Sequence, residues 1–256
     1  MRGTLACFVV LAGIACDPAP GGTPWHGDGG TTVPSLTVRG RVVNAETCFV
    51  SPGCQGVSGV IVAWPGAPDL VRSTPSSAEG AFRLEGIPRG IRLDLLALPQ
   101  DTAAAGFAAT YNPMVAAASA ADEVFGLDIY VLPRGSMSLL VGIQNETGIG
   151  LDARGGYIGQ VAQGHDAVIA ATVTVSPAQD PVRFVNVLPR LAMAGEPALL
   201  PEGTAATGGF GTFVVPSAGG MRDPVAFIVA KDGLTFDPVV APLIPGVVTF
   251  GVHSVR

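Results

Sequence analysis

The chain has 256 residues, of which 48% are hydrophobic and 13% charged, so it can build a sizeable core and disorder is not expected. Its formal net charge of −6 argues against a nucleic-acid partner, because an acidic surface repels phosphate groups. The high content of Gly (35) and Pro (22) is typical of many short strands joined by tight turns.

The first fifteen residues have the pattern of a secretory signal peptide, which we predict over residues 1–15. Arg2 supplies the positive charge, and Leu5 to Ala15 form an apolar run of eleven residues. A helix that spans a bilayer needs roughly 20 apolar residues, so this run is too short to be a membrane span. The sequence therefore predicts an exported protein.

Cys16 follows this run in a setting that resembles a bacterial lipobox, Leu11-Ala12-Gly13-Ile14-Ala15-Cys16. Gly13 departs from the pattern, which usually has an apolar residue there. A lipid on Cys16 would tether the protein to a membrane, most simply as an outer-membrane lipoprotein. Plain secretion after signal cleavage is the alternative, and a buried N-terminal strand is a third. Residues 16–35 read as the lipidated cysteine and a flexible linker.

Alternating apolar and polar residues over 36–134 predict a first β-sandwich domain. The expected strands are 36–42, 59–64, 80–84, 91–98 and 127–131. Between the first two, Cys48 and Cys54 flank a Pro-Gly loop and are best interpreted as a disulfide in an exported protein. A redox or metal pair would need CxxC spacing and further ligands.

The order of these segments resembles the carboxypeptidase regulatory-like family, a transthyretin-like β-sandwich. The resemblance is carried by Val38-x-Gly40-x-Val42, Gly59-Val60-Ile61-Val62, Gly80-Ala81-Phe82-Arg83-Leu84 and Ile87-Pro88-Arg89-Gly90. It implies an accessory or adhesive module rather than a catalytic centre.

The second half of the chain repeats the first, which predicts a second β-sandwich domain over 135–256. The matching segments are 171–177 with 59–65, 211–215 with 80–84, 226–230 with 93–97, 236–241 with 111–116, and 248–252 with 125–129. The second copy has no cysteine pair, and 182–187 is predicted as an extra or displaced strand. The predicted fold is thus all-β, with two tandem transthyretin-like or Ig-like sandwiches after a signal peptide and a linker.

No catalytic, cofactor or metal pattern stands out in the sequence. His26, His165 and His253 lie in unrelated contexts, and Asp122, Glu123 and Asp128 are as typical of a solvated loop as of a cation site.

The candidate ligand-binding loops are Tyr111-Asn112-Pro113 and Phe236-Asp237-Pro238, where an aromatic ring and an Asx side chain could stack on a sugar. The alternative is that Asx-Pro starts a turn and the aromatic ring packs into the core. We therefore expect a non-enzymatic envelope protein with a structural or adhesive role, without cofactors and with a surface glycan or protein as a possible partner. A carbohydrate- or peptide-binding accessory module is the alternative.

Overall fold

The computed structural model describes residues 35–48, 53–66, 71–100, 104–113, 122–137, 155–164, 166–178, 182–187, 193–216 and 224–256. The chain divides into two units, Met1–Val33 and Pro34–Arg256, and the described residues all belong to the second. Among the described residues, the regular elements are strands, apart from the short helix α1 (Ala45–Cys48) and the short 3-10 helix η1 (Arg134–Met137). The all-β prediction is confirmed.

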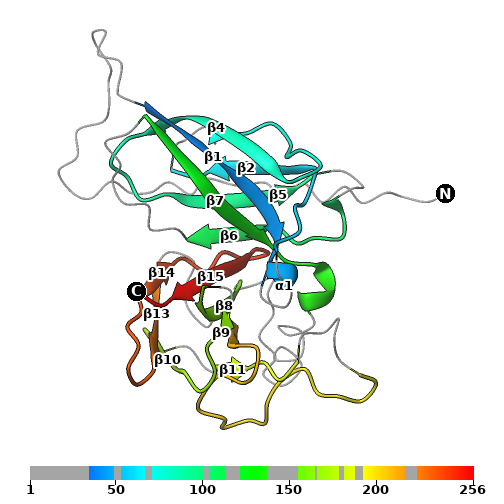
Figure 1. The fold of residues 1–256 in the computed structure, drawn as a ribbon, viewed down its shortest axis with the longest axis vertical. Coiled ribbons are helices and arrows are strands. Elements are labelled where there is room, and N and C mark those ends of the chain that lie inside the picture. The colour runs from blue at the N-terminus through cyan, green and yellow to red at the C-terminus, as the bar shows by residue number, and fades with distance from the viewer. Residues whose placement is uncertain are drawn as a thin grey trace. The chain divides into compact units, whose positions relative to one another are not determined.

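The strands fall into two sets, which we call the first and the second repeat (Figure 1). The first repeat contains β1 (Ser35–Asn44), β2 (Val60–Trp64), β3 (Val71–Arg72), β4 (Ala81–Pro88), β5 (Asp94–Pro99), β6 (Thr110–Pro113) and β7 (Glu123–Val131). The second contains β8 (Gly156–Gln163), β9 (Asp166–Ala167), β10 (Thr172–Ser176), β11 (Arg183–Phe184), β12 (Thr212–Pro216), β13 (Val225–Ala230), β14 (Val239–Ala241) and β15 (Val248–Ser254).

Both repeats pair their strands in the same way. In the first repeat, β1 lies between antiparallel β4 and parallel β7, and β5 lies between antiparallel β2 and β6. In the second, β8 lies between antiparallel β12 and parallel β15, and β13 lies between antiparallel β10 and β14. The internal repeat read from the sequence is therefore a repeat of topology. The short strand β11 pairs with β12, as expected for an extra strand in the second copy.

A turn before β2 and β10 fixes the register of the repeat. Ser76 bonds to the backbone of Gly59 and Val60 in the first repeat, and Thr207 bonds in the same way to Ala170 and Ala171. Gly59 and Ala170 also share a left-handed backbone, with φ of 73° and 56°. Ala170, not Ala171, therefore stands in the place of Gly59, and the register expected from the sequence was wrong by one residue.

Each repeat has its own hydrophobic core between two layers of strands. In the first, alternate residues of β1, β4 and β7 face those of β2 and β5, with Leu84, Leu95 and Ile129 fully buried. In the second, β8, β12 and β15 face β10 and β13 around Tyr157 and Phe213. The alternating pattern predicted that each strand has one solvent-exposed face. This holds for β4, where Phe82 and Leu84 are buried while Arg83 and Glu85 are exposed.

The two repeats share one continuous sheet, in the order β11-β12-β8-β15-β6-β5-β2-β3. Its centre is a parallel pairing of β15 with β6, where Val248 lies opposite Thr110 and Thr249 opposite Tyr111. A third apolar cluster flanks this pairing and joins residues of both repeats: Ala45, Ala108 and Leu132 with Ile158, Val185, Val214, Val248 and Phe250. We call the pairing and this cluster the joint. The predicted boundary at residue 134 stays a prediction.

Candidate functional site

Tyr111 and Asn112, from the first predicted ligand loop, are buried in β6. The Asn112 side chain accepts a hydrogen bond from the Tyr130 backbone N–H (2.8 Å) and donates one to the Tyr130 carbonyl (3.1 Å). The Asn112 side chain thus forms the two hydrogen bonds that the backbone of a neighbouring strand would form, and it connects β6 to β7. Burial, together with the nearby Asp94 carboxylate, raises the pKa of Tyr111 above its usual range. Both residues contribute to the framework, and ligand binding by them stays a prediction.

Phe236 and Asp237, from the second predicted loop, lie at the surface of the second repeat. Phe236 is half-buried and bridges to Val255, while exposed Asp237 pairs with the guanidinium of Arg256. Strand pairing places Pro113 opposite Asp94 and Val240 opposite Ala226.

In the register fixed by Gly59 and Ala170, Ala226 takes the place of Asp94, so Tyr111 corresponds to Pro238. The two loops are therefore not equivalent, contrary to the expectation from the sequence, because the match of aromatic-Asx-Pro letters is two residues out of register.

A hollow of about 650 Å³ opens beside Phe236. Its lining combines apolar side chains with the chain's single lysine, Lys231, the carboxylate of Asp232 and the hydroxyls of Thr172 and Thr235. The Lys231 ammonium donates a hydrogen bond to the Ile169 carbonyl (2.7 Å), which holds the side chain along one wall. The lining thus includes one aromatic and several polar side chains, which is the composition of many sites for small polar ligands.

A buried polar pair lies in the core of the second repeat. The Tyr157 hydroxyl is 2.8 Å from His253 Nε2, and the Tyr157 ring stacks on Phe227 with centroids 3.6 Å apart. Among the described residues, His253 Nδ1 has no hydrogen-bond partner. Burial lowers the pKa of His253 to about 4 and raises that of Tyr157, so the pair is neutral at pH 7.

Room for this pair comes from Gly251, because a Cβ there would lie 2.0 Å from the Tyr157 hydroxyl oxygen. The pair is sealed from solvent and has no access to a substrate. No pattern in the sequence indicates this pair, because its two residues are 96 positions apart and meet only through the register of β8 and β15.

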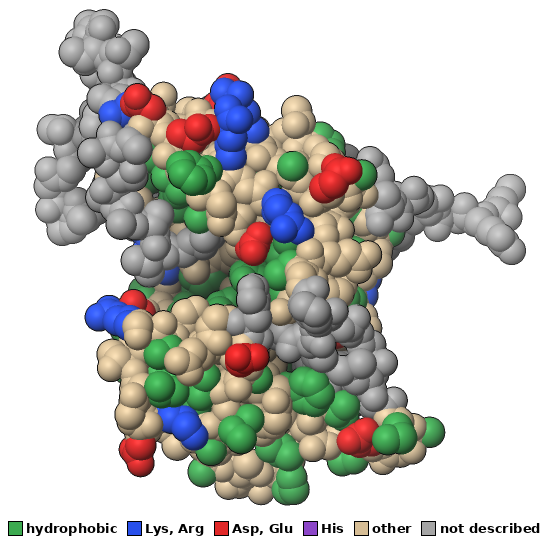
Figure 2. All heavy atoms as spheres, in the orientation of Figure 1, with side chains coloured by type: hydrophobic (Ala, Val, Ile, Leu, Met, Phe, Trp, Pro, Cys, Tyr) green, Lys and Arg blue, Asp and Glu red, His purple; other side chains and the backbone are tan. Residues whose placement is uncertain are grey.

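The acidic residues considered as a cation site are dispersed. Asp122 pairs with Arg89, Glu123 pairs with Arg39, and Asp128 lies further along β7. Within the described part of the chain, no group of three His, Cys, Asp or Glu side chains is placed to hold a metal ion. Acidic and basic side chains are interspersed on the face shown in Figure 2.

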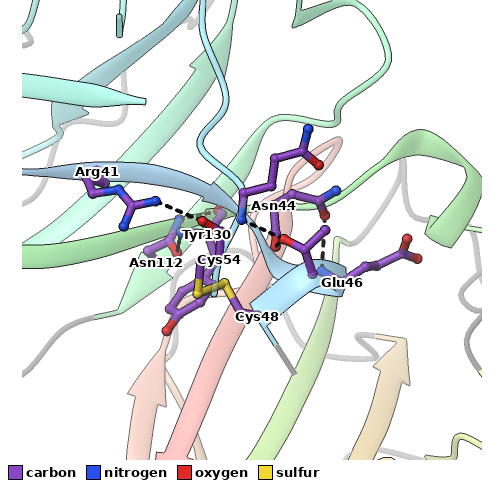
Figure 3. The surroundings of a disulfide bond; sticks show 9 residues. Arg41, Asn44, Glu46, Cys48, Cys54, Asn112 and Tyr130 are labelled. Carbon is purple, nitrogen blue, oxygen red and sulfur yellow. Dashed lines mark hydrogen bonds between the residues drawn. A yellow bond between two sulfur atoms is a disulfide. The ribbon is translucent and has the colours of Figure 1, made fainter. Parts of the chain in front are cut away.

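The predicted disulfide between Cys48 and Cys54 is confirmed. It closes the loop after α1, and two hydrogen bonds between side chains and the backbone hold this loop (Figure 3). The Arg41 side chain on β1 donates to the Cys54 carbonyl (2.8 Å), and Thr47 Oγ1 in α1 accepts from the Gln55 N–H (2.9 Å). Inside α1, the Glu46 side chain accepts a hydrogen bond from Ser136. The disulfide therefore fixes the segment that presents Ala45 to the joint. Cys16, the predicted lipidation site, lies outside the described residues, as do His26 and His165.

Comparisons with known proteins place the chain in no family. No family model matches it, and no curated protein does. Among solved structures it is similar to the shaft pilin SpaA from Lactobacillus rhamnosus GG, with a TM-score of 0.25, 10% identity, and coverage of 88% of this chain and 98% of that one. It is also similar to a Streptococcal ancillary pilin, with a TM-score of 0.24, 11% identity, and coverage of 86% and 69%. Scores of this size support no statement about a shared function.

Within the described segments, no helix is long and apolar enough to cross a membrane.

Proposed function

We propose that this protein is a non-enzymatic structural or adhesive protein of the cell envelope that bears tension along its chain. The observation that carries the proposal is the pairing of the first and the last long strand in each repeat. β1 runs parallel to β7 over seven paired positions, and β8 runs parallel to β15 over seven more.

This arrangement resists a force applied through the two ends of the chain. The chain enters each repeat at the start of its first strand and leaves at the end of its last strand, which is the opposite end of the same parallel pair (Figure 1). Tension therefore slides the paired strands along each other, and the evenly spaced bonds of a parallel pair share the load. A force that pulled the strands apart sideways would break the same bonds one after another.

Single-molecule force spectroscopy tests this reading. The chain pulled through its termini should unfold at a markedly higher force than the same chain pulled through cysteines placed at Thr37 and Glu123. These two residues lie opposite each other at one end of the β1–β7 pair, so that pulling on them unzips the strands. Equal forces in the two geometries would contradict the proposal. In the native host, cells that lack the chain should lose attachment or envelope integrity under flow.

A ligand-binding accessory role is the second candidate, and the hollow beside Phe236 favours it. A sugar ring stacked on Phe236 could form hydrogen bonds with Asp232, Lys231 and Thr235. Phe236→Ala should then abolish binding on a glycan array. Phe125→Ala is the matched control, because Phe125 is 78% exposed in the first repeat and away from the hollow. Equal binding by both variants would exclude the hollow.

The export and anchoring of the chain are also proposals. The apolar run before Cys16 and the Cys48–Cys54 disulfide, which suits an oxidising compartment, support export. Metabolic labelling with palmitate should mark the wild-type chain and be lost in Cys16→Ser. If Cys16→Ser partitions into detergent as the wild type does, the anchor is elsewhere. We further infer that the likeness to the carboxypeptidase regulatory-like family extends to the second repeat, since both repeats pair their strands alike.

A further inference from the structure

One edge strand of the described sheets lacks the protection that the others have. Edge strands expose unpaired N–H and C=O groups, and proteins usually place charges on them to prevent pairing with another chain. Charged side chains protect the edges of β3 (Arg72), β4 (Arg83 and Glu85) and β7 (Glu123 and Asp128). The Leu200 N–H donates to the Phe184 carbonyl at the edge of β11, and the Val240 carbonyl of β14 accepts a hydrogen bond from Arg92. β10, with the sequence Thr-Val-Thr-Val-Ser, has no charge.

Comparison with the first repeat shows what is missing at this edge. There, the outer edge of β2 is covered by β3 and by Ser73, whose N–H donates to the Val62 carbonyl (2.8 Å) and whose hydroxyl accepts from the Val62 N–H (2.9 Å). In the second repeat, Thr207 covers only Ala171 in this way.

Backbone groups alternate along a strand, so the N–H and C=O of Val173 and Val175 point to the same outer edge as those of Ala171. No described residue pairs with β10 on that side. Among the described residues, the edge left without backbone partners is therefore two residues long, Val173 and Val175. In the first repeat, Ser73 and β3 cover the equivalent edge of β2.

The outer face next to this edge is uncharged as well. Thr172, Thr174 and Ser176 are exposed, and Thr174 lies opposite Ile228 of β13, which is 43% exposed. The two threonines are polar and β-branched, and such side chains suit a sheet that continues into another strand.

We propose that β10 pairs with β10 of a second copy of this chain, antiparallel and with Thr174 on the two-fold axis. Val173 of each copy then lies opposite Val175 of the other, and the two pairs exchange four backbone hydrogen bonds. Thr174 faces its own counterpart, which is a favourable cross-strand pair.

A second copy fits this edge better than a charged partner does. Both faces of the pairing are uncharged, so no charge is desolvated although each chain carries a net charge of −6. The paired strands are short, so the dimer is weak and concentration-dependent. The proposal is independent of the proposed resistance to tension, which depends on β1, β7, β8 and β15.

Disulfide trapping tests the register directly. In the full chain carrying Cys7→Ser and Cys16→Ser, Thr174→Cys should form a disulfide-linked dimer under mild oxidation, because opposed residues at a non-hydrogen-bonded site have Cα atoms about 4.5 Å apart. Thr172→Cys is the matched control. Its counterpart would lie roughly 14 Å away, beyond the reach of a disulfide. If Thr174→Cys cross-links no faster than Thr172→Cys, the proposal is wrong.

A charge at the same position provides an independent measurement. In sedimentation experiments, Thr174→Lys should lose the concentration-dependent dimer that the wild type forms, while Thr74→Lys on an exposed site of the first repeat should retain it. Circular dichroism shows whether both variants are folded. A wild-type chain that stays monomeric at every concentration, or a Thr174→Lys chain that still dimerises, would overturn the proposal.

Discussion

The outer faces of the two equivalent sheets differ although their strands pair in the same way. In the first repeat, Arg39 on β1 lies opposite Arg83 on β4, and both are half exposed. In the second, the same positions are Ile158 on β8 and Val214 on β12, which lie opposite each other and are buried in the joint. The two repeats have the same topology, so topology does not explain this difference. A strand that borders the joint is apolar on both faces, whereas a strand that borders solvent alternates apolar and polar residues.

The far end of the second repeat shows the same rule. Tyr130 and Leu132, which the first repeat contributes to the joint, correspond to Ser254 and Arg256 in the second. Arg256 pairs with Asp237, so this end is polar where the equivalent end of the first repeat is apolar.

The inner faces differ as well. The buried aliphatic pair Val38 and Ile129 of the first repeat is replaced by Tyr157 and His253. Gly251 replaces Leu127 and leaves room for the tyrosine ring. The core of the second repeat therefore contains a hydrogen-bonded Tyr–His pair at positions that the first repeat fills with aliphatic side chains.

Exchanging the outer-face residues should give the largest effect. Val214→Arg places in the joint the residue that the first repeat has at this position, and burying an unpaired charge should cost about 4 kcal/mol or more. The control is Arg83→Val, which removes an exposed pair with Glu85 and should change stability by no more than about 0.5 kcal/mol. Denaturant unfolding followed by circular dichroism measures both, and similar stabilities would refute the account of the joint.

The buried histidine should make the second repeat sensitive to acid. Its pKa falls from 6.5 to about 4 on folding, so the unfolded chain binds a proton first as the pH drops. The stability that neutral His253 contributes is complete above pH 6.5 and is lost as the pH falls towards 4, by about 3 kcal/mol.

His253→Ile, the residue of the first repeat, should flatten the pH dependence of unfolding in this range. The comparison uses the slope rather than the absolute stability, because the variant also leaves the Tyr157 hydroxyl without its partner. Identical slopes for variant and wild type would show that His253 titrates normally in the folded chain.

Filling the space above Tyr157 should destabilise the second repeat by about 2–3 kcal/mol. Gly251→Ala brings a methyl group to 2.0 Å from the tyrosine oxygen, so the ring must leave its rotamer or the strands must move. Adding Tyr157→Val, as in the first repeat, should recover part of the loss, and thermal unfolding of the single and double variants measures the coupling. Strictly additive effects would contradict a direct clash.

The strands and the repeat could be predicted from the sequence because they depend on local alternation and on turn residues. Phe82 and Leu84 alternate with exposed neighbours, and the match of 80–84 with 211–215 holds in the structure. The match of β1 with β8 was missed. Val38-x-Gly40-x-Val42 corresponds to Tyr157-x-Gly159-x-Val161, and the signal was hidden because a tyrosine replaces a valine.

The joint and the Tyr157–His253 pair could not be predicted. Both depend on which strands meet across long stretches of chain, and a shift of one residue in register reverses every side chain. The one-residue error at Ala170 and the two-residue error at Phe236 show how small a misalignment misplaces a candidate site. The apolar run of β12 was visible in the sequence, and it was the sign that both faces of this strand are covered.

Removal of the disulfide tests a segment that only the first repeat has. Cys48→Ser with Cys54→Ser should cost about 2 kcal/mol, the chain-entropy value for so small a ring. The loop fixes α1 and hence Ala45 in the joint, which also contains Val214. When the two cysteine changes are combined with Val214→Ala, the loss of unfolding free energy should therefore exceed the sum of the two separate losses. A variant as stable as the wild type under oxidising conditions would show that α1 is held by its hydrogen bonds alone.

The smallest expected effect concerns the turn that fixes the register of the two repeats. Ala170 has a left-handed backbone that costs an L-residue roughly 1 kcal/mol, whereas the first repeat uses Gly59 at the same place. Ala170→Gly should therefore stabilise the chain by about 0.5 kcal/mol, because relief of strain is partly offset by the entropy of the unfolded glycine. Gly59→Ala is the reciprocal change and should destabilise it by roughly 1 kcal/mol. Precise denaturation midpoints for the pair check the equivalence, since two shifts of the same sign would mean that these residues do not occupy the same position in the repeat.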